Sequence, residues 1–171
     1  MGLENNKKLK SVNLQKIKIN DAFWTKYTKL VKDVIIPYQW NILNDNVKGA
    51  EPSHCLKNFK IAAGESSGEF GGAVFQDTDV AKWLEAVAYT LATDKDKNLE
   101  ATADEVIDLI GRAQCEDGYL NTYFTIKEPE LRWTYLMEGH ELYTAGHLLE
   151  AAIAYYNATG KDKFLNIMIK F

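Results

Sequence analysis

The chain has 171 residues, of which 46% are hydrophobic and 26% charged, a composition that fits one soluble globular domain. The formal net charge of −4 at pH 7 gives no reason to expect binding to nucleic acid or to an anionic membrane. No apolar run approaches membrane-spanning length, and no secretory signal stands at the start. The two cysteines, Cys55 and Cys115, have no CxxC partner, which favours a reduced pair in a cytoplasmic protein.

The first part of the chain predicts a strand followed by an interrupted helix. We expect residues 1–10 to form a flexible N-terminus, and the alternation of apolar and polar residues over 12–19 predicts a short strand. Asp21 can cap a helix that runs to Ile35, because apolar residues recur there at spacings of three and four. Pro37 should interrupt or kink this helix, since proline lacks an amide proton and clashes with the preceding turn.

The middle of the chain predicts an irregular segment and then a helical hairpin. Residues 44–72 are rich in glycine, which is typical of loop backbone. Thr78 or Asp79 then opens a helix with one apolar face, and a second helix spans about 99–114. These two helices should form an antiparallel hairpin.

The last part predicts a second hairpin. The dipeptide at 117–118, Asp-Gly, is a turn signal, and residues 119–124 should be extended. A third helix is expected over about 139–158, and a fourth begins near Lys161. Nothing before Phe171 has the character of a helix terminator, so we expect the chain to end inside this fourth helix.

The first and third helices belong to a repeat. Ala86-Val87-Ala88-Tyr89 matches Ala152-Ile153-Ala154-Tyr155, and Lys95-Asp96-Lys97 matches Lys161-Asp162-Lys163, at a constant offset of 66 residues. A repeated hairpin indicates stacked hairpins, in either an open solenoid or a closed ring. The side chains expected to be buried between them are Trp83, Val87, Leu91, Val106, Ile110, Leu149 and Ile153.

The residue pattern alone supplies no complete active site. There is no phosphate-binding glycine loop and no HExxH motif. His140 and His147 share one helical face, but two histidines without further ligands do not favour a metal site.

Carboxylates gather at Asp77 and Asp79 and again at Glu138 and Glu141, and glycoside hydrolysis commonly uses two carboxylates. The sequence does not place them across a pocket, however, and Asp79 could equally be a helix N-cap.

Several sequence blocks, in order and covering nearly the whole chain from about residue 12, resemble glycoside hydrolase family 127, the β-L-arabinofuranosidases. They are Ile36-Pro37-Tyr38-Gln39-Trp40, Val74-Phe75-Gln76-Asp77-Thr78-Asp79, Asp117-Gly118-Tyr119-Leu120-Asn121-Thr122 and His140-Glu141-Leu142-Tyr143. The resemblance implies an all-α fold, here an incomplete (α/α)6 barrel (toroid) of antiparallel hairpins that occupies residues 11–171. It also implies retaining hydrolysis of terminal β-L-arabinofuranosyl groups.

The same resemblance implies a zinc-bound cysteine nucleophile and a glutamate acid/base, with two further cysteines and a glutamate as zinc ligands. Cys55 and Cys115 do not match these cysteines. We therefore expect no catalytic residue and no metal ligand in this chain, with zinc only in the complete enzyme. The fragment should be inactive alone, because the catalytic residues are expected beyond Phe171.

Three residues are expected to bind substrate. His140 matches the pocket histidine of the family, and Phe75 and Asp77 stand in a block expected to line the pocket. The implied partner is an arabinofuranoside-containing oligosaccharide. The alternative is a non-catalytic helical remnant or a sugar-binding module.

Overall fold

The computed structural model describes residues 11–171, so the flexible N-terminus predicted for residues 1–10 lies outside the described residues. Within the described part every regular element is helical, which confirms the predicted all-α class there. The elements in chain order are η1 (Leu14–Lys16), α1 (Ala22–Leu30), η2 (Val31–Ile35), α2 (Ile36–Leu43), α3 (Cys55–Ala62), α4 (Asp77–Thr93), α5 (Lys97–Ala113), α6 (Thr122–Ile126), η3 (Pro129–Leu131), α7 (Leu136–Gly139), α8 (Glu141–Thr159) and α9 (Lys163–Lys170).

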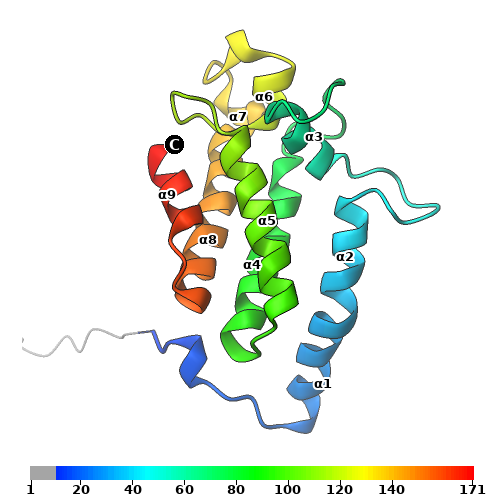
Figure 1. Ribbon diagram of the computed structural model, residues 1–171, viewed down its shortest axis with the longest axis vertical. Coiled ribbons are helices and arrows are strands. Elements are labelled where there is room, and N and C mark those ends of the chain that lie inside the picture. The colour runs from blue at the N-terminus through cyan, green and yellow to red at the C-terminus, as the bar shows by residue number, and fades with distance from the viewer. Residues whose placement is uncertain (1–10) are drawn as a thin grey trace, which may run out of the picture.

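Helices α4 and α5 form one antiparallel hairpin, and α8 and the shorter α9 form a second one stacked on it (Figure 1). α4 and α8 pack along each other, while the short helices α3, α6 and α7 gather at one end of the bundle. α4 and α8 end 66 residues apart, at Thr93 and Thr159, and α5 and α9 begin 66 residues apart, at Lys97 and Lys163. The hairpin repeat predicted from the sequence is therefore a repeat of structure.

One continuous core joins these helices. Trp83, Val87, Leu91, Val106 and Ile110 are buried as predicted. The largest fully buried apolar side chains are Tyr155, Phe59, Phe164, Leu84, Leu91, Ile107, Ile110, Leu120 and Leu148.

The predicted burial of Leu149 and Ile153 is wrong, because these side chains are 42% and 46% exposed. α4 packs against both α2 and α8, whereas α8 packs against α4 and α9. No long helix packs over Leu149 and Ile153 in the described part, and Ile153 lines a hollow with residues 11–14, so both side chains remain largely exposed.

The strand predicted near 12–19 is also wrong. All ten residues of 11–20 are exposed, and the only regular element among them is the single 3-10 turn η1. Asn13 starts this turn by accepting a hydrogen bond from the Gln15 amide at 2.9 Å. Alternation alone does not make a strand, because a strand also needs a neighbouring strand to bond its backbone.

The Gln15 side chain ties this segment to the end of α8. Its amide nitrogen donates to the carbonyl oxygens of Asn157 (3.1 Å) and Ala158 (2.9 Å). The last carbonyls of a helix have no intrahelical partner, so this side chain supplies one.

Asp21 caps α1 as predicted, with its carboxylate accepting hydrogen bonds from the amides of Phe23 (3.0 Å) and Trp24 (2.7 Å). The interruption expected at Pro37 is present but takes the form of a π-helical turn, η2, directly before it. A wider turn accommodates a proline because the clash with the carbonyl one turn earlier is relieved.

Three further boundaries differ from the sequence prediction. α4 begins at Asp77 with Gln76 at the N-cap position, so Asp79 lies inside the first turn. Residues 119–124 are not extended throughout, because Asn121 caps the short helix α6. The irregular segment 44–72 contains the helix α3.

The third predicted helix is divided at His140. α7 ends at Gly139, His140 adopts a left-handed backbone (φ 52°), and α8 begins at Glu141. A left-handed residue breaks the helical hydrogen-bond ladder, so α7 and α8 are separate helices.

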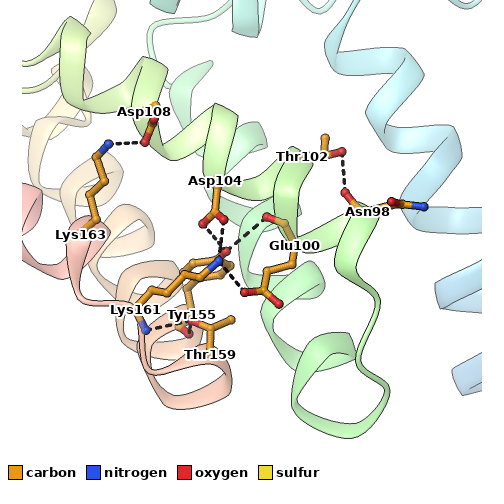
Figure 2. Close-up of polar contacts among 9 residues, drawn as sticks. All are labelled: Asn98, Glu100, Thr102, Asp104, Asp108, Tyr155, Thr159, Lys161 and Lys163. Carbon is orange, nitrogen blue, oxygen red and sulfur yellow. Dashed lines mark hydrogen bonds and ion pairs between the residues drawn. The ribbon is translucent and has the colours of Figure 1, made fainter.

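The repeated Lys-Asp-Lys turn has a structural role that Figure 2 shows. Its lysines lie at the start of α9 and pair with acidic side chains along α5, where the buried Tyr155 also donates a hydrogen bond. The pairs are Lys161 with Glu100 (2.5 Å) and Asp104 (2.6 Å), Lys163 with Asp108, and Tyr155 Oη with Asp104 Oδ1 (2.7 Å).

Among residues 11–171, none of the helices combines the length and the apolar character needed to cross a membrane.

Candidate substrate-binding site

His140 and Phe75 lie together although 65 positions separate them in the chain. Their rings meet edge to face, with centroids 5.2 Å apart. Phe75 lies two residues before the start of α4, and His140 directly precedes α8, so the packing of α4 on α8 brings the two residues together. Phe75 is 42% exposed and His140 is half-buried, so both can be reached from solvent.

The first turns of α8 extend this pair. Tyr143 lies with its ring centroid 5.6 Å from that of His140, and His147 follows at 4.7 Å from Tyr143. Lys82 of α4 completes the surface, because its ammonium donates to Tyr143 Oη at 3.4 Å and to Thr78 Oγ1 at 3.2 Å. We call Phe75, Lys82, His140, Tyr143 and His147 the α4–α8 surface.

This surface has the chemistry of a polyol-binding site. Aromatic rings pack against the C–H faces of a sugar, and imidazole, phenol and ammonium groups hydrogen-bond its hydroxyls. The five side chains of this surface include no carboxylate themselves, and Glu150 Oε2 lies 3.7 Å from His147 Nδ1. The rings and polar groups of the surface can orient a sugar.

Asp77 lies in the interior rather than on this surface. Its carboxylate accepts two hydrogen bonds from Thr122, from the amide at 2.7 Å and from the hydroxyl at 2.5 Å. Burial raises the pKa of Asp77 to about 6, and the two bonds from Thr122 offset part of that effect. Asp77 fixes α6 against the start of α4, which makes it a structural support of the site.

Glu141 is a second interior carboxylate, and the sequence pattern alone did not distinguish it from the other acids. It is fully buried and accepts hydrogen bonds from Tyr119 Oη (2.5 Å) and from the backbone amide of Trp133 (3.0 and 2.9 Å). Burial and the bond to Glu141 raise the pKa of the Tyr119 phenol. Arg132 lies over the Tyr119 ring, 4.1 Å from its centroid.

Tyr143 and Lys82 were not predicted as site residues. Tyr143 could have been found, because it stands three residues after His140 and four before His147, which places all three on one side of the helix. For Lys82 the sequence carries no such signal, since its place depends on how α4 packs against α8.

No group of three His, Cys, Asp or Glu side chains within residues 11–171 is arranged to hold a metal ion. Cys55 is buried, its thiol lies 3.3 Å from the Gln76 carbonyl, and burial raises the pKa of this thiol well above its usual value. A zinc ligand or nucleophile must be a thiolate, so this environment opposes both roles. Cys55 therefore does not fit the zinc-bound cysteine that the family implies.

Residues 16–171 match the family described as β-L-arabinofuranosidase, GH127 catalytic domain. The chain belongs to glycoside hydrolase family 127. One relative is a non-reducing end β-L-arabinofuranosidase of Bifidobacterium longum subsp. longum, 40% identical over 170 residues, a match that covers 90% of this chain and 26% of that protein.

Solved GH127 structures share this fold. A crystal structure of a GH127 β-L-arabinofuranosidase from Geobacillus stearothermophilus T6 matches with a TM-score of 0.89 and 63% identity, over 90% of this chain and 24% of that one. A second GH127 β-arabinofuranosidase matches with a TM-score of 0.83 and 34% identity, over 93% and 25% of the two chains. The chain thus spans about a quarter of the length of these relatives.

Proposed function

We propose that the α4–α8 surface forms one part of the arabinofuranoside-binding pocket of a retaining GH127 hydrolase. This enzyme removes terminal β-L-arabinofuranosyl groups. Family membership supports the reaction class, since the relatives are described as β-L-arabinofuranosidases. The observation that carries the proposal is the His140–Phe75 pair at the adjoining starts of α4 and α8. The substrate is an oligosaccharide with an arabinofuranosyl group at its non-reducing end.

We infer that the stacked hairpins belong to a closed (α/α)6 barrel. The support is the apolar face of α8, where the side chains of Leu149 and Ile153 are exposed. A further hairpin packed on α8, as α8 packs on α4, would bury this face and favour ring closure.

His140 is the residue on which we base the substrate contact. Its imidazole orients a sugar hydroxyl without breaking a bond. In the complete enzyme, His140→Ala should lower kcat/KM for an arabinofuranoside. The loss should correspond to about 1–3 kcal/mol of transition-state stabilisation, because the sugar hydroxyl bound by the imidazole loses its hydrogen-bond partner. Unchanged kinetics in an equally folded variant would contradict this role and leave His140 a structural residue.

We further propose that the nucleophile, the acid/base and the zinc ligands do not come from these 171 residues. The interior positions of Asp77 and Glu141 and the absence of a three-ligand cluster in the described part support this. The purified chain should neither hydrolyse a nitrophenyl β-L-arabinofuranoside nor retain stoichiometric zinc. Turnover that a chelator abolishes would refute the proposal.

A further inference from the structure

Glu141 stands at a junction of the structure. It is the first residue of α8, directly follows His140, and its side chain has no exposed surface. Its two oxygens accept hydrogen bonds from two separate segments, the Tyr119 phenol and the Trp133 backbone amide. One carboxylate thus connects the start of α8 to both segments.

A buried carboxylate is costly, so these contacts must compensate for its lost hydration. The Arg132 guanidinium lies over the Tyr119 ring and bonds Cys115 Sγ (3.1 Å) and Asp117 (3.3 Å) rather than Glu141. The carboxylate is therefore held by a phenol and an amide, whose directions are specific. Such bonds fix geometry more strictly than a surface ion pair does.

His140 needs an external support of this kind. Its left-handed backbone (φ 52°) is unfavourable for a residue with a Cβ, and its side chain makes no capping hydrogen bond to α8. On the other side, Gly139 packs so closely against Phe124 that an added Cβ would lie 2.9 Å from its ring. The backbone at residues 139–141 is thus held on two sides.

We propose that Glu141 is the positioning residue of the site: its hydrogen bonds to Tyr119 and Trp133 hold His140 in the left-handed conformation that places the imidazole against Phe75. Its importance for sugar binding rests on the proposed function. Its effect on the geometry of His140 does not.

Two substitutions separate hydrogen bonding from charge. Glu141→Gln keeps an acceptor for the Trp133 amide and a donor for the Tyr119 hydroxyl, which can turn to accept, whereas Glu141→Ala removes both contacts. Glu130→Gln is the matched control, because Glu130 is an exposed acid in the same connecting segment. All three are made in the 171-residue chain.

Two readouts by NMR test the proposal. The first is the set of His140 ring and amide resonances together with the Phe75–His140 ring contact. The second is the Kd for methyl β-L-arabinofuranoside. Glu141→Ala should shift the His140 resonances, abolish the ring contact and weaken binding about tenfold, while Glu141→Gln should stay within about threefold of the wild type. Glu130→Gln should match the wild type.

If Glu141→Ala does not fold, Tyr119→Phe tests the proposal in its place, because it keeps the aromatic ring and removes the hydroxyl that donates to Glu141. It should shift the His140 resonances and weaken binding about threefold. Unchanged His140 resonances in a folded Glu141→Ala or Tyr119→Phe chain overturn the proposal. If the wild-type chain does not bind the glycoside, the proposed function fails at this site, and the His140 resonances alone decide the role of Glu141.

Discussion

Asp77 is a buried carboxylate, and its burial raises its pKa to about 6. The ordinary value is 3.8, so between pH 3.8 and 6 folded Asp77 keeps a proton that the unfolded chain has released. The free energy of unfolding should therefore fall as pH rises through this window. The whole decrease, complete above about pH 6, should be no more than about 3 kcal/mol.

Asp77→Asn should lack this contribution, because an amide does not titrate. Urea unfolding of both proteins from pH 4 to pH 7 measures it: the difference between wild type and variant should change across the window. Parallel stability profiles would show that Asp77 is not protonated in the folded chain over this range.

At the scale of residues, the sequence pointed to some of the site and not to the rest. His140 stands in a recognisable block, and Phe75 in another, so their types and order were visible. The role of Glu141 was not, because its donors are a phenol 22 residues away and a backbone amide 8 residues away. Because every residue except proline has a backbone N–H, the residue type at position 133 does not indicate that its amide bonds Glu141.

At the scale of elements, the turn between α5 and α6 packs closely on the end of α9. Gly118 has a positive φ of 89°, and a Cβ there would lie 2.0 Å from the Lys170 carbonyl oxygen. Gly118→Ala should lower the free energy of unfolding by about 2–4 kcal/mol, through both backbone strain and the clash.

Gly146→Ala is the matched control for this glycine. Gly146 lies inside α8 and an added Cβ would meet nothing within 4 Å, so alanine should stabilise the chain by about 0.5–1 kcal/mol. Equal effects of the two substitutions in urea unfolding would contradict the described packing of α9.

Tyr155 provides a second test of how the hairpins are joined (Figure 2). Tyr155 is 1% exposed, and its hydroxyl donates a hydrogen bond to Asp104 at 2.7 Å. Tyr155→Phe should therefore lower the free energy of unfolding by about 0.5–1.5 kcal/mol. Tyr156→Phe, at a side chain 43% exposed, should change stability by less than about 0.5 kcal/mol. Chemical unfolding of both variants should rank them in this order, and the reverse order would contradict the placement of α8.

Helical periodicity predicted the elements well where a helix buries one broad face, as α4 and α5 do. It failed at residues 12–19, where alternation occurs without a pairing strand, and at His140, where contacts to distant segments divide a periodic stretch. In both places the deciding interactions lie outside the local sequence.

At the scale of the whole molecule, stacking of two equivalent hairpins places the start of α8 beside the start of α4 (Figure 1). The exposed Phe75 and Tyr143 and the half-buried His140 meet there, while Asp77 and Glu141 support them from the interior. The repeat was visible in the sequence, and it predicted the pairing of α4 with α8. It did not predict which side of α8 is covered, because that depends on neighbours outside the repeat.

The central claim is that this end of the α4–α8 pair recognises an arabinofuranosyl group through His140. An NMR titration of the 171-residue chain with methyl β-L-arabinofuranoside tests it most directly. We predict saturable shift changes centred on His140, Phe75 and Tyr143, which His140→Ala abolishes while the fold persists. Absence of saturable changes, or changes confined to the opposite end of α8 near Asn157, would contradict the claim.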